Sequence, residues 1–110
     1  MSWWSAHLLY YSRFRDGIQD YYVVTEDIVL LQASDGAEAE ARALKIGEER
    51  KMVSDTWVCD GRPADEVFLG FRKVIQCQNP TDIPGDGTEL SYSEFMVKDR
   101  ESLERLLAGQ

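Results

Sequence analysis

The chain has one histidine, His7, and any acid–base chemistry near neutral pH would depend on it. It falls in the middle of an apolar stretch typical of a strand, and Glu26 would lie near it if a hairpin closes around residues 16–20. A catalytic histidine also needs a nucleophile oriented beside it, and none stands at a diagnostic spacing. We therefore predict no catalytic residue, and we keep His7 and Glu26 as candidate binding residues.

Residues that hold ions in other proteins lack the necessary spacing here. The stretch 82–87 begins like a calcium loop, but its third position is Pro84 and its closing position is Ser93. Cys59 and Cys77 have no second cysteine or histidine at the spacing of zinc ligands. Because no secretory signal precedes them, we expect two reduced thiols. The sequence predicts no metal site and no cofactor.

Aromatic side chains are the least ordinary feature of the sequence, since they are more numerous than one small core needs. One part of them belongs to the core, and the remainder would be typical of an interface, where Trp and Tyr concentrate binding energy. If a small molecule binds instead, we expect a pocket between the sheet and the loop at 79–88. Its candidate lining residues are Trp57, Tyr92 and Glu94.

The net charge of the chain indicates which classes of macromolecule can bind it. Twenty acidic and 12 basic residues give a net charge of −8, and the basic residues are not gathered in one segment. A phosphate backbone repels such a chain, so nucleic acid is not an expected partner, whereas a basic protein or a second copy is. No apolar run approaches the roughly 20 residues that span a bilayer, and the first residues do not form a signal peptide. We expect a cytoplasmic protein that binds no membrane.

Periodicity and turn residues predict a single α+β domain over residues 1–110. Its order is strand, strand, helix, three strands, helix, with about five strands in a mostly antiparallel sheet. One long helix packs on one face of the sheet through small residues, and a short C-terminal helix carries an apolar stripe of Leu103, Leu106 and Leu107. The predicted strands are 3–14, 21–33, 56–59, 66–78 and 89–97, and the long helix is 37–52.

Three positions in these elements carry further expectations. The second strand is apolar on both faces at 28–31, so we expect it to be central in the sheet and covered on both sides. One long helix can cover one face only, so the apolar residues on the other face need a different cover. We therefore predict a homodimer through the sheet. Gly70 suggests a bulge or a close backbone approach, and Gly47 either ends the long helix early or marks close packing.

Five groups of residues between position 3 and about position 96 form a recognisable pattern: Trp4-Ser5-Ala6, Glu26 with Ile28-Val29-Leu30-Leu31-Gln32-Ala33, Lys45-Ile46-Gly47, Phe68-Leu69-Gly70-Phe71 with Val74, and Glu89-Leu90-Tyr92-Ser93. In these segments the sequence resembles a bacterial family catalogued as domain of unknown function number 4288. The resemblance implies a stand-alone bacterial domain of about this length, and it carries over no functional residue.

Two hypotheses from different classes follow from the sequence. The first is a non-catalytic protein-binding module, in its concrete form an immunity-type protein that neutralises a basic toxin or nuclease. The alternative is a small-molecule binding protein or small enzyme that uses the pocket described above. Small size, acidity, abundant aromatic residues and the lack of a catalytic motif favour the first.

Overall fold

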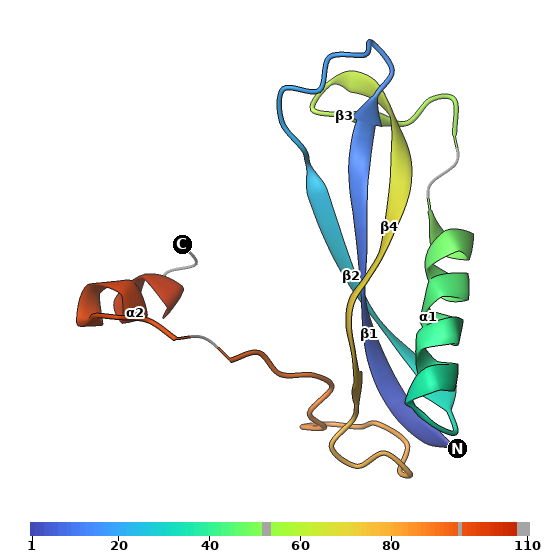
Figure 1. The fold of residues 1–110 in the computed structure, drawn as a ribbon, viewed down its shortest axis with the longest axis vertical. Coiled ribbons are helices and arrows are strands. Elements are labelled where there is room, and N and C mark those ends of the chain that lie inside the picture. Colours follow the sequence, from blue (N-terminus) through green and yellow to red (C-terminus); the bar gives the residue numbers. More distant parts are fainter. Residues whose placement is uncertain (52–53, 95, 108–110) are drawn as a thin grey trace.

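A computed structural model describes residues 1–51, 54–94 and 96–107 of the chain. It is an α+β fold with a four-stranded antiparallel sheet and two helices (Figure 1). The strands are β1 (Ser2–Phe14), β2 (Val24–Ala33), β3 (Val58–Cys59) and β4 (Arg62–Gln76). The helices are α1 (Gly36–Arg50), which lies along the sheet, and α2 (Arg100–Leu107), which lies apart from it.

The sheet has the order β2-β1-β4-β3, so β1 is the central long strand. It pairs antiparallel with β2 on one side and with β4 on the other, so β2 and β4 run in the same direction with β1 between them. Our expectation that the second strand is central is therefore wrong, because the crossover through α1 places β4 beside β1 and leaves β2 at the edge.

The expectation that residues 28–31 are covered on both faces of the sheet is also wrong. Val29 and Leu31 face α1, while Ile28 and Leu30 lie on the opposite face and are 54% and 39% exposed. The apolar run thus marks an edge strand with one covered face and one open face. A run of four apolar residues cannot distinguish that arrangement from a buried central strand.

The helix α1 covers one face of the sheet, and its length and position agree roughly with the prediction. Asp35 is its N-cap and accepts a hydrogen bond from the amide of Glu38 at 2.9 Å. Ala39 and Ala43 are fully buried against the sheet, which lets the two backbones approach closely. The predicted end at Met52 lies outside the described residues. The core between helix and sheet consists of Ala6, Leu8, Tyr10, Leu31, Ala33, Ala39 and Ala43.

Both glycine expectations are confirmed as structural features. A Cβ added to Gly47 would lie 2.1 Å from the ring of Phe68, so this glycine marks close packing of α1 on the sheet. The hydroxyl of Tyr10 donates a hydrogen bond of 2.9 Å to the Gly47 carbonyl. Gly70 has a φ of 128° and lies between two register shifts in the pairing of β1 with β4.

The Asp60-Gly61 hairpin signal is also confirmed. Both residues have positive φ, 52° and 74°, as a two-residue type I′ turn requires. They connect β3 to β4. The predicted fifth strand is wrong: within the described part of 89–97, no residue belongs to a strand. This segment instead crosses the face of the sheet opposite α1, where its polar groups bind side chains of the sheet.

Two further results concern membranes and thiols. Among the described residues, no helix is long and apolar enough to cross a membrane. Cys59 is half-buried and Cys77 is buried, and both are free thiols. Burial raises the pKa of the Cys77 thiol, which makes it a poor nucleophile.

Candidate functional site

A row of polar side chains crosses the face of the sheet opposite α1, which we call the open face. His7 on β1 is only 4% exposed and occupies the centre of this row. Its Nδ1 lies 3.3 Å from a carboxylate oxygen of Glu26 on β2, as the hairpin spacing predicted. Its Nε2 lies 2.7 Å from the hydroxyl of Ser91 in the crossing segment. Both ring nitrogens of this buried histidine therefore have partners.

Glu26 has a second partner on β4. The guanidinium of Arg72 holds its carboxylate through two hydrogen bonds, 2.5 Å from Nε and 3.1 Å from Nη2. These bonds from Arg72, and then the bond from His7, lower the pKa of Glu26 from its ordinary value of 4.5 to about 2. The same pairing raises the pKa of Arg72. Glu26 is thus a carboxylate at any pH above about 4.

The bulge in β4 explains why two consecutive cations reach the open face. His7 pairs with Lys73 and Leu8 pairs with Phe71, so Arg72 is an extra residue without a partner on β1. Lys73 keeps the alternation of the strand, and Arg72 departs from it. Strict alternation would place Arg72 and Lys73 on opposite faces of the sheet, but both line the same cleft.

Lys73 attaches the crossing segment to the sheet. Its ammonium donates to the carbonyl of Tyr92 and, at 2.9 Å, to the hydroxyl of Ser93. It also lies 5.9 Å from the centre of the Tyr92 ring, within cation–π range. Together with the His7–Ser91 bond, these contacts hold residues 91–93 over the middle of the sheet.

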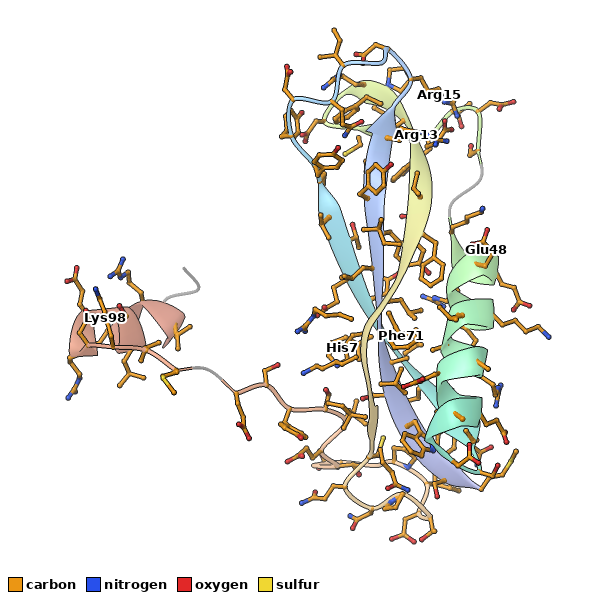
Figure 2. The ribbon with its side chains drawn as sticks, in the orientation of Figure 1. His7, Arg13, Arg15, Glu48, Phe71 and Lys98 are labelled. Atoms are coloured by element: carbon orange, nitrogen blue, oxygen red, sulfur yellow. The ribbon has the colours of Figure 1, made fainter. Side chains whose placement is uncertain are left out.

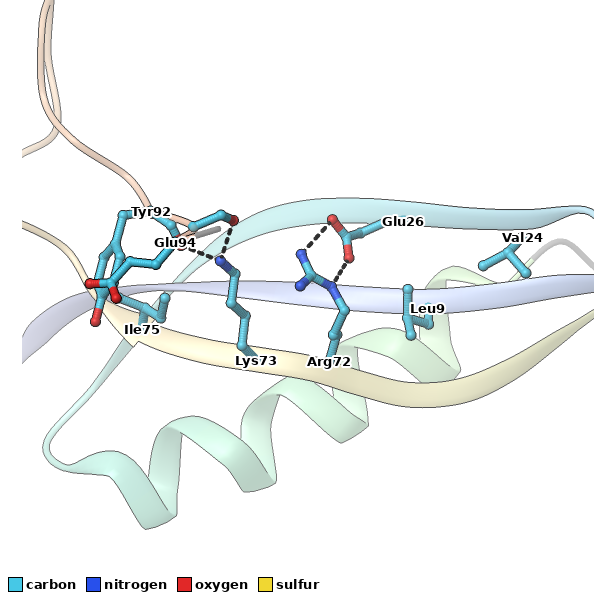
Figure 3. A pocket seen from close by; sticks show the side chains of 9 residues that line it. Leu9, Val24, Glu26, Arg72, Lys73, Ile75, Tyr92 and Glu94 are labelled. Atoms are coloured by element: carbon cyan, nitrogen blue, oxygen red, sulfur yellow. Dashed lines mark hydrogen bonds and ion pairs between the residues drawn. The ribbon is translucent and has the colours of Figure 1, made fainter. Parts of the chain in front are cut away.

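The crossing segment and the sheet border an open cleft of about 730 Å³ (Figure 3). This cleft is lined by residues 92–94 of the segment, whereas we expected a pocket beside the loop at 79–88, none of whose residues line it. Arg72 and Glu26 meet in its middle, and Tyr92 and Glu94 lie at one end of it. Two cations and two carboxylates lie beside apolar side chains, so the cleft has no dominant sign of charge. Its lining residues are Leu9, Val24, Glu26, Arg72, Lys73, Ile75, Tyr92, Ser93 and Glu94.

The structure brings four of the five candidate binding residues together. Tyr92, Glu94 and Glu26 line the cleft, and His7 is bonded to Glu26. Trp57 lies elsewhere. Its carbonyl accepts a hydrogen bond from Ala64, which pairs with the last residue of β1 at the far end of the sheet. Figure 2 shows that end, marked by Arg13 and Arg15, well away from His7.

Sequence reasoning missed Ser91, Arg72 and Lys73. Ser91 is 84 positions from His7, and no spacing rule joins two residues so far apart. The adjacent cations in β4 were a usable signal, because a charged pair within an apolar strand implies a local irregularity. Gly70, two residues earlier, pointed to the same irregularity.

Ser91, His7 and Glu26 stand in the order of a hydroxyl nucleophile, a base and an orienting carboxylate. In a hydrolase this order lets the imidazole accept the serine proton while the carboxylate fixes the ring. Here His7 is almost fully buried, and Ser91 is not among the residues that line the cleft. The arrangement therefore serves first to satisfy a buried histidine and to anchor the crossing segment.

The open face also carries exposed apolar side chains beside the polar row. Val24, Ile28 and Leu30 point to this face from β2, with Glu26 between the first two, and Val24 is as exposed as Ile28, at 54%. Tyr22, just before the strand, is exposed and packs edge to face on Tyr11, with 5.3 Å between ring centres. A line of exposed apolar residues on an edge strand is typical of an interface.

Comparison with known proteins identifies the family of the chain. The family model described as "Domain of unknown function (DUF4288)" matches residues 3–92, so the chain belongs to this family, as the segments of the sequence indicated. The matched range includes His7, Glu26, Arg72, Lys73 and Ser91. No curated protein and no solved structure gives a significant match to the chain.

Proposed function

For this member of a family whose description names no activity, we propose a non-catalytic protein-binding module that binds through the open face of its sheet. The observation that carries this proposal is the line of exposed apolar side chains on β2, namely Val24, Ile28 and Leu30. Full burial of one such side chain stabilises a complex by about 1.5–3 kcal/mol relative to exposure. A partner that covers this line therefore gains a large part of its binding energy there.

The edge of the sheet supports the same proposal. In the described part of the chain, β2 pairs with β1 only, so no strand pairs with its outer edge. At one end of this edge the Gln32 carbonyl accepts a hydrogen bond from Arg42 of α1. Natural edge strands usually avoid pairing through charges, proline or short length. β2 has ten residues and no proline or lysine, and its charges are Glu26 and Asp27. A strand or loop of a partner can extend the sheet at this edge.

Charge favours a basic partner over an acidic one. The net charge of the chain is −8, and residues 79–94 contain four acidic side chains and no lysine or arginine. This stretch includes the segment that crosses the open face, and its acidic residues are Asp82, Asp86, Glu89 and Glu94. A cationic protein approaching the open face would be attracted by this stretch, as in an immunity-type protein that neutralises a basic toxin or nuclease.

A second copy of the chain could also cover the open face, and we propose a homodimer through the sheet. Apolar cover for Ile28 and Leu30 does not require a charged partner, and two copies related by a two-fold axis present the same residues to each other. A dimer of this kind does not exclude a basic partner, which would bind the acidic stretch at 79–94.

One pair of variants tests the proposed surface. Ile28→Asp places a charge on the open face, and Leu44→Asp places one on the exposed side of α1, where Leu44 is 48% exposed. We expect Ile28→Asp alone to abolish self-association in sedimentation velocity. It should also weaken retention of a panel of purified basic proteins on the immobilised chain at low salt. Retention should fall as salt is raised.

Equal behaviour of the two variants would contradict the proposal, since it would show that the open face contributes no more than the back of α1. Failure of the wild-type chain to self-associate and to retain any basic protein at low salt would also contradict it. Far-UV circular dichroism of both variants shows whether they remain folded.

The cleft favours a second candidate function, a small-molecule binding protein or small enzyme. Its volume of about 730 Å³ lies within the range of ligand pockets, and Lys73, whose ammonium bonds only neutral oxygens among the described residues, would suit an anionic group. The Ser91–His7–Glu26 row would supply the chemistry if Ser91 became accessible. A thermal-shift screen of anionic metabolites tests binding, since a ligand in excess stabilises the protein that binds it.

Reaction with a fluorophosphonate probe tests the enzyme form of this second candidate. Labelling of the wild-type chain that is lost in Ser91→Ala and kept in Ser93→Ala would support a nucleophilic serine. A flat thermal screen together with no labelling would exclude this candidate and leave the protein-binding proposal in place.

A further inference from the structure

In the part of the chain that the structure describes, the apolar side of α2 is exposed. Leu103 and Leu106, one turn apart, are 51% and 43% exposed. Among the described residues, the hydrogen bonds and ion pairs of 98–107 all stay within that segment. Helices shorter than about 12 residues are marginal in water and gain most of their stability from packing. An eight-residue helix with two exposed leucines therefore needs another surface.

The open face of the sheet offers a surface of matching kind. Leu9, Val24 and Ile75 form the apolar part of the cleft, and Ile28 continues it along β2. An eight-residue helix is about 12 Å long, at 1.5 Å per residue. The cleft has a volume of about 730 Å³, which is large enough for the side chains of two leucines one turn apart.

We propose that residues 96–107, which we call the arm, pack α2 onto the open face of a second copy, and that two copies exchange arms reciprocally. This inference rests on the proposed function, because it assigns the occupant of the same open face. In Figure 1, α2 lies apart from the sheet of its own chain. A helix held away from its own sheet is placed to reach another.

The charge of the arm does not oppose this docking. Its three basic residues balance its three acidic residues, namely Lys98, Arg100 and Arg105 against Asp99, Glu101 and Glu104. Among the described residues, Lys98 and Arg105 have no ion pair. On the receiving copy, Glu94 lines the cleft and the acidic stretch 79–94 borders it. Opposite charges around an apolar contact fix its orientation more than they add to its affinity. A reciprocal exchange also closes the assembly at two copies.

The test compares the oligomeric state of the full chain with that of three variants, by sedimentation velocity at micromolar concentration. Leu103→Glu with Leu106→Glu alters the arm, Ile28→Glu alters the open face, and Leu44→Glu is the control. We expect dimers for the wild type and the control. Each of the other two should raise the dimer dissociation constant at least roughly tenfold, as loss of central apolar contacts does.

A mixture of the arm variant and the Ile28→Glu variant separates exchange from other dimers. Arm exchange predicts partial recovery, because one intact arm then meets one intact face in the mixed dimer. If the arm variant stays dimeric while Ile28→Glu is monomeric, the open face binds a second copy without the arm. The inference then fails, and the proposed function stands.

Docking of α2 on its own sheet would also overturn the inference. The wild-type chain would then be monomeric, and the arm variant would melt at a lower temperature than the control. A monomeric wild type whose melting temperature the arm variant leaves unchanged would overturn it as well. If that monomer also retains no basic protein, the proposed function fails with it.

Discussion

The two faces of the sheet are built on different principles. On the face under α1, small and apolar residues pack against the helix, and Ala6, Leu8 and Tyr10 are almost fully buried. On the open face, a polar row centred on His7 is covered by a segment without regular structure. Apolar residues of β2 stay exposed beside it. The apolar residues of one face are buried by α1, whereas apolar residues of the other face remain exposed to solvent.

This difference separates stability from function. The α1 face is held by apolar burial and close contact, which give stability but offer nothing to a partner. The open face is held by a few hydrogen bonds and ion pairs, and it exposes both charge and apolar surface. Substitutions on the first face should mainly change the free energy of unfolding, and substitutions on the second should mainly change binding.

The largest expected effect comes from two neighbouring leucines on opposite faces of β1. Leu8 is fully buried under α1, whereas Leu9 lines the cleft. Leu8→Ala should lower the free energy of unfolding by about 2–5 kcal/mol, because it removes buried surface and leaves a cavity. Leu9→Ala should cost about 1 kcal/mol or less, because its side chain is partly in water.

Urea unfolding followed by circular dichroism measures both values. Equal losses for the two variants would show that the open face is as fully packed as the α1 face, which would remove the distinction drawn above. A larger loss for Leu9→Ala would reverse it.

A smaller effect is expected at the closest contact between α1 and the sheet. Gly47→Ala places a Cβ against the Phe68 ring, which cannot move freely because it packs on Tyr10 with 5.2 Å between ring centres. Overpacking of this kind costs about 1–3 kcal/mol, and it outweighs the roughly 1 kcal/mol that alanine gains over glycine in a helix. The thermal midpoint should fall.

Gly85→Ala is the matched control, since no atom lies within 4 Å of the added Cβ there. We expect its midpoint to stay within experimental error of the wild type. A Gly47→Ala variant as stable as this control would mean that α1 can move away from the sheet without cost.

The elements of the α1 face could be predicted from the sequence, and those of the open face only in part. Periodicity and small residues indicated α1, and Asp60-Gly61 indicated the β3–β4 turn, because these signals are local. The position of β2 at the edge depends on which strands pair, which is a long-range choice. The crossing segment was predicted as a strand at 89–97, whereas its described residues belong to no strand.

The candidate site shows the same limit. Tyr92, Glu94 and Glu26 were named from the sequence and do line one cleft. Trp57 was named for its residue type alone, and it lies at the far end of the sheet. Ser91 could not be found, because its partner is His7 across 84 positions and neither residue has a neighbour in sequence that reports the contact.

The smallest expected effect is a pH dependence that belongs to the open face alone. The pKa of Glu26 is lowered from 4.5 to about 2 in the folded chain, chiefly by the hydrogen bonds from Arg72. Its carboxylate therefore contributes stability that is present above about pH 4.5 and is lost as the pH falls toward 2. Because the group is partly exposed, solvent screening reduces this contribution to about 1 kcal/mol.

Urea unfolding at pH 6, 4 and 2.5 measures this contribution in the wild type and in Glu26→Gln. The wild type should lose about 1 kcal/mol more than the variant between pH 6 and 2.5, since glutamine cannot be protonated in that range. Glu94→Gln is the matched control, because it removes a carboxylate from the same cleft that has no ion pair among the described residues. Its pH dependence should follow that of the wild type. If Glu26→Gln also follows the wild type, the ion pair with Arg72 contributes nothing measurable, and the open face is held by His7, Ser91 and Lys73 instead.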